Sequence, residues 1–293
     1  MTTYRVTHRT EYEYEEDVAA SHSRLHLLPR DGPAQTCMST EIASLPLAGD
    51  YSEHTDFFGN RVGYLAIHET HRTLDITATS VVEVDDGERE PSLFGERPWE
   101  AVRDAVWREG RPDAVDAMPF ALDSPLVAAS DALRAYAEPS FPPGRALLDA
   151  VLDLSSRIHA DFAYEPGATE VGTTLEEVLV ERKGVCQDFA HVGIGCLRSL
   201  GLPARYVSGY LETDPPPGRP KLVGADVSHA WFSVLLPEEG WLDVDPTNDQ
   251  LVNSRYVVAA FGRDYRDVPP ISGVIYTEGS SSTLTVKVDV SVV

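Results

Sequence analysis

The sequence contains few cysteines and no long apolar run. Its 293 residues include three cysteines, too few for a disulfide framework and typical of a protein from a reducing compartment. No apolar run approaches the ~18 residues that a membrane-spanning helix needs. The first residues also lack the basic, apolar and small-residue pattern of a secretory signal. Together these absences predict a cytoplasmic protein.

Positively charged residues are also scarce. Lysine and arginine number 24, against 47 aspartates and glutamates, and the formal net charge is −23. This charge opposes contact with phosphate backbones and anionic lipids, so we expect no nucleic-acid partner and no membrane partner. The acidic residues are spread along the chain, which favours a well-solvated surface over a functional acidic tail.

The chain does contain ample apolar material for a core, with 42% hydrophobic residues. Residues 1–90 are predicted to form strands and hence a β-rich domain, and residues 4–14 alternate so that one face of their strand is half-buried. We expect this domain to be a packing or interaction module without chemistry. Its predicted strands lie near residues 4–14, 23–28, 38–45, 61–69 and 74–84.

The remainder of the chain divides into two predicted regions. Residues 91–140 are expected to form a helical linker region, and residues 141–293 a catalytic core. The core should end in a strand at about residues 283–293 that joins an existing sheet. Four helix starts are predicted in these regions. They lie at Pro98, at residues 123–125, at Gly144 and at a capping box formed by Thr174 and Glu177. The helix that starts at residues 123–125 is expected to run to about Ala137.

One predicted helix begins with a thiol. Apolar and small residues recur at helical spacing over residues 185–200, and Gly201 with Pro203 is a stop signal. Cys186 therefore lies in the first turn, where free N–H groups and the helix dipole favour a thiolate and could hold an oxyanion. The alternative is a small buried residue without chemistry. Cys196 falls on the core face, beyond disulfide reach of Cys186.

Two later strands could supply the base. Residues 229–236 and 241–246 flank a turn and should form an antiparallel hairpin. If Trp231 lies opposite Asp245, then His229 is the diagonal neighbour of Asp245, within hydrogen-bonding reach. The carboxylate would fix the tautomer of the imidazole, and the imidazole would take the proton of the thiol.

Other residues compete for these roles. Asp243 shares the face of Asp245 but lies nearer the turn, so we rank it second. His191 follows the thiol by five residues on the same helix, a spacing that points it away. Asp226, His229 and the two aspartates could also be metal ligands, but no second histidine stands at a suitable spacing. We expect no metal and no cofactor, and no EF-hand-like calcium loop is visible.

Four segments carry a family resemblance: residues 184–191, 197–210, 228–231 and 245–248. They resemble the bacterial transglutaminase-like family, within the papain-like cysteine acyltransferases and proteases. The resemblance implies that Cys186 is the nucleophile, His229 the base and Asp245 the residue that orients it. Residues 4–14 and 56–60 resemble the β-rich N-terminal domain of such proteins, and residues 262–270 resemble their C-terminal signature.

The chain departs from the family pattern at two places. Residues 224–228, just before His229, look longer than the usual approach to this strand. Residues 255–257 stand where the family often has a histidine–isoleucine pair. The second change could alter the rim of the site, but it removes no member of the triad.

We therefore expect an α+β fold, in which an N-terminal β-sandwich precedes a papain-like core with a buried catalytic helix on an antiparallel sheet. The expected reaction is attack of the Cys186 thiolate on an amide carbonyl, which gives a thioester. Water would make the protein a peptidase or amidase, and an amine would make it a transglutaminase. The expected partner is a protein or peptide substrate, with Gln187, Tyr164 and Trp231 in the substrate or oxyanion region. The rival hypotheses are an inactive protein-interaction module on the same fold and a metal-dependent hydrolase.

Overall fold

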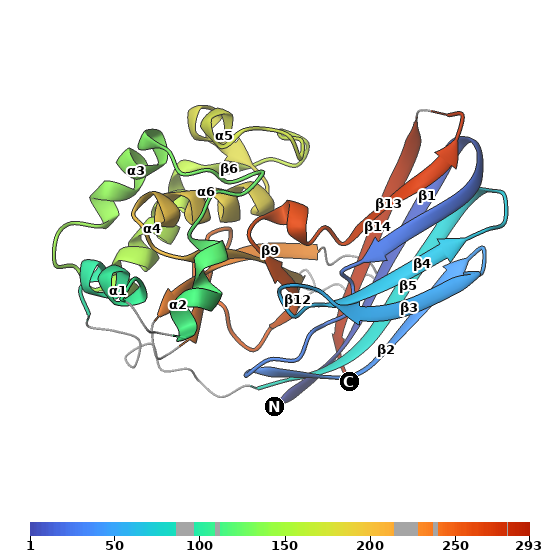
Figure 1. The fold of residues 1–293 in the computed structure, drawn as a ribbon, viewed down its shortest axis with the longest axis horizontal. Coiled ribbons are helices and arrows are strands. Elements are labelled where there is room, and N and C mark those ends of the chain that lie inside the picture. Colours follow the sequence, from blue (N-terminus) through green and yellow to red (C-terminus); the bar gives the residue numbers. More distant parts are fainter. Residues whose placement is uncertain (86–96, 109–111, 214–227, 237–239, 280) are drawn as a thin grey trace, which may run out of the picture.

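The first region of the chain and its C-terminal residues together form a seven-stranded antiparallel sheet (Figure 1). The computed structural model describes residues 1–85, 97–108, 112–213, 228–236, 240–279 and 281–293. The strands of this sheet are β1 (Thr2–Leu25), β2 (Gln35–Leu45), β3 (Asp50–Thr55), β4 (Arg61–Ile67), β5 (His71–Val84), β13 (Ile271–Thr277) and β14 (Ser282–Val292). The predicted C-terminal strand is thus confirmed, and the sheet that it joins is the N-terminal one.

Strand β1 organises this sheet. Its first half lies between β5 and β14, and its second half lies between β4 and β13. β4 and β5 pair with different halves of β1. Leu65 and Ile67 of β4 share a buried cluster with Leu74 and Ile76 of β5, so apolar side chains fill the space between these two strands. This is the β-rich N-terminal domain that the alternation of residues predicts.

Two details of this domain differ from the prediction. β1 is continuous where two strands were expected, and its pairing with β5 shifts register between Glu13 and Val18. β3 was not predicted, because all of its residues are exposed and it therefore lacks the alternation that marks a half-buried strand.

The second half of the chain contains a five-stranded sheet in the order β11-β10-β9-β8-β12. Its strands are β8 (Ala204–Leu211), β9 (Ser228–Leu236), β10 (Gly240–Asp245), β11 (Gln250–Leu251) and β12 (Tyr256–Gly262). The helices are α1 (Trp99–Val106), α2 (Pro112–Ala117), α3 (Asp131–Ala137), α4 (Leu147–Asp161), α5 (Leu175–Glu181) and α6 (Cys186–Ser199). A short parallel pair, β6 (Ala163–Tyr164) and β7 (Lys183–Gly184), precedes α6.

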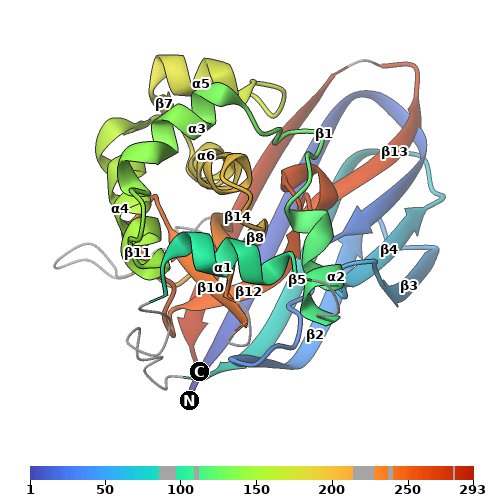
Figure 2. The same cartoon turned by 60° about the vertical axis from the view of Figure 1, so that its left-hand side comes forward.

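Helix α6 lies between this sheet and helices α3, α4 and α5 (Figures 1 and 2). It contacts β8 and β9 on one side and α3, α4 and α5 on the other. Every residue from Asp188 to Ser199 is buried, as expected for a helix that is covered on all sides. Its glycines allow this: a Cβ at Gly193 would lie 2.6 Å from the ring of Phe232. The predicted buried helix on an antiparallel sheet is confirmed.

The structure bears on further predictions made for the rest of the chain. The capping box of Thr174 and Glu177 is present at the start of α5. The helix expected from residues 123–125 begins only at Asp131, because Ser130 is the residue that caps it, while Ser124 forms a turn with Val127. No strand was predicted between Asn248 and the C-terminal strand, but this stretch contains β11, β12 and β13. The expected linker at 85–96 and the turn at 237–239 lie almost wholly outside the described residues.

The N-terminal domain holds the outer edge of β12 through two side-chain amides. Gln35 donates to the carbonyl of Val258 and accepts from its N–H, both at 2.8 Å. Asn60 does the same to Phe261, at 2.8 and 3.0 Å. The remaining bonds of Asn60 go to Asp56 and Arg30, so this buried amide uses its full hydrogen-bonding capacity.

Replacement of Asn60 by alanine is expected to lower the free energy of unfolding by roughly 2–4 kcal/mol, because it leaves the backbone N–H and C=O of Phe261 without these partners. Chemical denaturation measures this loss. Asn253→Ala is a suitable control, since that exposed side chain caps a single loop N–H and should cost about 1 kcal/mol or less. Equal losses in the two variants would show that the amide contacts to β12 contribute little.

No helix within the described part of the chain combines the length and apolar character needed to cross a membrane.

Candidate active site

Cys186 is the first residue of α6 and is partly accessible. The turn before it is fixed by Asp188, whose carboxylate accepts from the N–H of Val185 at 2.8 Å and from the hydroxyl of Thr169 at 2.6 Å. The first N–H groups of a helix have no partner within the helix. The thiol therefore lies at the positive end of a helix that the rest of the core holds in place.

His229 lies near the start of β9 and contacts Asp245 at the end of β10. Nε2 of the imidazole is 2.7 Å from Oδ2 of the carboxylate, and both side chains are buried. Val244 pairs with Phe232, and continuing this register places Asp245 opposite Trp231. The diagonal arrangement inferred from the alternation of residues is thus the one observed. Asp245 thus engages Nε2 of His229, and His229 lines the same cavity as Cys186.

The carboxylate of Asp245 has several hydrogen-bond partners. Besides His229, it accepts from the hydroxyl of Tyr256 at 2.7 Å, from the amide of Asn248 at 2.6 Å and from the N–H of Thr247 at 2.9 Å. Burial alone would raise the pKa of Asp245. The hydrogen bonds and the charge of His229 outweigh it, so the pKa lies below its ordinary value.

The imidazole of His229 is correspondingly basic. Burial alone would lower its pKa, but the hydrogen bond and charge of Asp245, together with Cys186, raise it to about 10. At neutral pH His229 is therefore an imidazolium that is paired with Asp245 and lines the same cavity as Cys186. A cation in this position stabilises a thiolate.

This raised pKa predicts a pH-dependent contribution to stability. A histidine whose pKa rises from 6.5 to about 10 on folding stabilises the fold fully below pH 6.5, and the contribution is lost as the pH rises toward 10. The free energy of unfolding should therefore fall more steeply across this window in the wild type than in His229→Gln. Urea denaturation at several pH values measures both slopes, and parallel curves would contradict the assigned pairing.

The competing residues have other contacts. Asp243 accepts from the hydroxyl of Ser233. His191 is buried, and burial lowers its pKa to about 4, so it is neutral and accepts from the N–H of Tyr265 at 3.1 Å. Cys196 is fully buried, which raises its pKa to about 12. None of the three is placed to share the contact between His229 and Asp245.

A cavity of ≈ 280 Å³ opens at Cys186 and His229, and both sheets line it. Gln187 lines it as expected. Trp231 does not: its indole is wholly buried and packs edge-on against Tyr256, so the expectation that it meets substrate is wrong. Tyr164 is also not a lining residue. It is 51% exposed on β6 and lies edge-on to Phe189.

The N-terminal domain supplies one wall of this cavity, which was not predicted. His8, Thr10 and Tyr12 of β1 line it together with Leu284 and Val286 of β14. The alternation of residues 4–14 showed that these side chains share a face of the sheet. It could not show that this face lies over Cys186.

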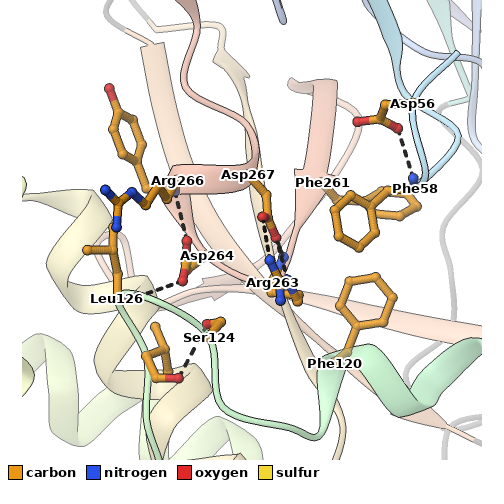
Figure 3. Close-up of polar contacts among 12 residues, drawn as sticks. Asp56, Phe58, Phe120, Ser124, Leu126, Phe261, Arg263, Asp264, Arg266 and Asp267 are labelled. Carbon is orange, nitrogen blue, oxygen red and sulfur yellow. Dashed lines mark hydrogen bonds and ion pairs between the residues drawn. The ribbon is translucent and has the colours of Figure 1, made fainter. Parts of the chain in front are cut away.

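The connection between β12 and β13 supplies another wall of the cavity, and Figure 3 shows polar contacts that hold this connection. Arg263 makes a two-pronged ion pair with Asp267, and Asp264 accepts from the N–H groups of Leu126 and Arg266. These contacts and the bond from its N–H to His191 fix Tyr265, which lines the cavity along with Pro270 and Ile271. The segment that resembled a C-terminal signature thus shapes the site.

Nothing in the described residues forms a group of three or more histidine, cysteine, aspartate or glutamate side chains that could hold a metal ion. Asp226, one of the ligands considered for the metal-site alternative, lies outside the described residues. The longer approach expected at residues 224–228 also lies outside them, apart from Ser228.

Comparison with known proteins places this geometry in a family. Residues 4–83 match the bacterial transglutaminase-like N-terminal region, and residues 134–246 match the transglutaminase-like superfamily. An uncharacterised protein of Mycobacterium tuberculosis is 47% identical, over 98% of this chain and 92% of its own length. A protein-glutamine gamma-glutamyltransferase of Pseudomonas aeruginosa is 38% identical, over 41% of this chain and 18% of its own length.

A solved structure shares the whole fold. The crystal structure of a candidate cysteine protease from Cytophaga hutchinsonii superposes with a TM-score of 0.75 at 22% identity, over 99% of this chain and 90% of the other. At this identity the likeness concerns the fold, and it includes both the N-terminal sheet and the core.

Proposed function

The chain belongs to the transglutaminase-like superfamily, and from that premise we propose that it is a thiol enzyme that attacks amide carbonyls of proteins or peptides. Cys186 is the nucleophile, His229 the acid and base, and Asp245 the residue that orients the imidazole. The proposal rests on one observation above all: His229 is hydrogen-bonded to a fully buried carboxylate and lines the same cavity as the thiol at the head of α6.

In the proposed first half-reaction, the thiolate sulfur of Cys186 attacks the carbonyl carbon, and the carbonyl electron pair moves to oxygen. The first N–H groups of α6 are suitably placed to hold this oxyanion, and Gln187 lines the same cavity. The intermediate then collapses. The amine or ammonia leaves with the proton of the His229 imidazolium, and a thioester remains on Cys186.

In the second half-reaction, neutral His229 takes a proton from water or from an amine as that molecule attacks the thioester. The thiolate leaves, and thiolate and imidazolium are restored together. Water yields a carboxylic acid, so the enzyme is then a peptidase or amidase. An amine yields a new amide, so the enzyme is then a transglutaminase. The triad has the same task in both outcomes.

A mass-spectrometric screen of peptides, with and without an added primary amine, tests this proposal. Chain cleavage, conversion of a side-chain amide to an acid, and attachment of the amine each give a distinct mass. We expect at least one of these products with the wild type and none with Cys186→Ala. Products that form equally with both proteins, or with neither across a broad peptide set, would reject the proposed activity.

A further inference from the structure

The wall that the N-terminal sheet contributes to the cavity at Cys186 consists largely of apolar and aromatic side chains. Tyr12 pairs with Leu284 and Thr10 pairs with Val286 across the two strands. Side chains two residues apart in a strand lie on the same face, so these four side chains form one patch, and all four line the cavity. We call this patch the β1/β14 wall.

The wall exposes apolar side chains beside the reactive thiol. Leu284 is 54% exposed and Val286 is 45% exposed. Exposed apolar area costs free energy that burial against another apolar group recovers, at about 25 cal/mol per Å². Across from the wall, the same cavity contains Cys186 and His229. A molecule that occupies the cavity therefore covers the wall while it meets the nucleophile.

Charged side chains are directed away from this wall. Among the described residues that line the cavity none is aspartate, glutamate, lysine or arginine, although 24% of the chain is charged. On the same two strands the charges lie on the opposite face, where Lys287 pairs with Glu11 at 2.9 Å. A charged side chain placed against the wall would lose water without gaining an ionic partner from the wall residues, since the imidazolium of His229 lies across the cavity.

His8, which lines the cavity next to this wall, has its hydrogen-bonding groups occupied within the protein. His8 bonds to the hydroxyls of Thr10 and Tyr210, both at 3.2 Å. Burial lowers the pKa of His8 to about 4, so it is neutral and offers no charge to a ligand. The volume, ≈ 280 Å³, is near the lower end of the ~300–1,000 Å³ of small-molecule sites, which suits a short piece of extended chain.

From these features, and resting on the proposed function, we infer that the β1/β14 wall binds an uncharged, apolar side chain of the acyl-donor peptide next to the amide that Cys186 attacks. The N-terminal domain is then part of the substrate site. Leu284, Val286 and Tyr12 determine which peptides are accepted, while the triad determines what is done to them.

Peptide series provide the test. A peptide that the wild type converts is varied with leucine, glutamate or lysine at each position flanking the reactive residue, and kcat/KM is measured for each peptide. We expect one flanking position at which leucine is preferred over both charged residues by at least ~10-fold. Leu284→Lys should reverse this order in favour of glutamate at that position, and Val286→Lys provides a second variant of the same wall.

Thr285→Lys is the matched control, because it adds the same charge on the opposite face of the same strand, across from Glu11. It should leave the preference unchanged. If peptides are converted without any preference at flanking positions, or if Leu284→Lys and Val286→Lys behave like Thr285→Lys, the inferred role of the wall is wrong while the proposed chemistry stands. If the wild type converts no peptide, the proposed function itself fails.

Discussion

Alkylation of Cys186 by iodoacetamide at pH 6 is expected to be about 10²-fold slower in His229→Gln than in the wild type. An ordinary thiol with a pKa of about 8.5 is well under 1% thiolate at this pH. In the wild type, the pKa of His229 is raised to about 10 and His229 lines the same cavity as Cys186, so at pH 6 the thiol has an imidazolium nearby, and a nearby cation favours the thiolate. Glutamine removes the cation but keeps a donor for the buried Asp245.

The other cysteines make this measurement self-calibrating. Cys37 on β2 is partly accessible, and its contacts are with Ser39, Thr40 and Arg61, so its rate should be equal in the two proteins. Cys196 is fully buried and should not react. Peptide mapping by mass spectrometry gives a rate for each thiol between pH 5 and 10. A Cys186 rate that does not depend on His229 would remove the imidazole from the mechanism.

Replacement of Asp245 by asparagine is expected to lower kcat/KM by roughly 10³- to 10⁴-fold on any peptide that the wild type converts. The carboxylate accepts from His229, Tyr256 and Asn248. An amide has only one oxygen, and its NH₂ group would face donors. It can neither stabilise the imidazolium by charge nor keep the ring in the tautomer that the reaction needs.

Asp243→Asn separates this effect from a general loss of negative charge. Asp243 lies two residues earlier on the same strand and face, and its bond is to Ser233 rather than to His229. We expect this variant to retain nearly all of the wild-type kcat/KM. Thermal unfolding should show that both variants are folded at the assay temperature. Similar rates for the two variants would contradict the assignment of Asp245 as the orienting residue.

Much of the site could be predicted because its signals are local. Helical periodicity and the Gly201 and Pro203 stop signal placed Cys186 at the start of a helix. The hairpin followed from two short β-rich runs around a turn, and the alternation of side chains then put His229 and Asp245 on one face. Each of these signals spans fewer than about twenty residues, so no knowledge of distant pairing was needed.

What could not be predicted depends on contacts between distant segments. Tyr12 and Leu284 are separated by most of the chain, and alternation identifies the faces of a strand without identifying its partner. Trp231 illustrates the converse error. It shares a face with His229, as expected, but Tyr256 of the unpredicted strand β12 packs against it and the indole is fully buried. The sequence pattern predicts which side chains share a face of a strand, whereas tertiary packing determines which residues cover that face.

The amides of Gln35 and Asn60 have a consequence for the behaviour of the protein at high concentration. A strand at the margin of a sheet offers a row of N–H and C=O groups on which a strand of another molecule can add. On β12 the two amides occupy such groups at Val258 and Phe261. The N-terminal domain thereby blocks the addition of a strand from another molecule to β12. Without this domain, the exposed edge of β12 would be a template for aggregation.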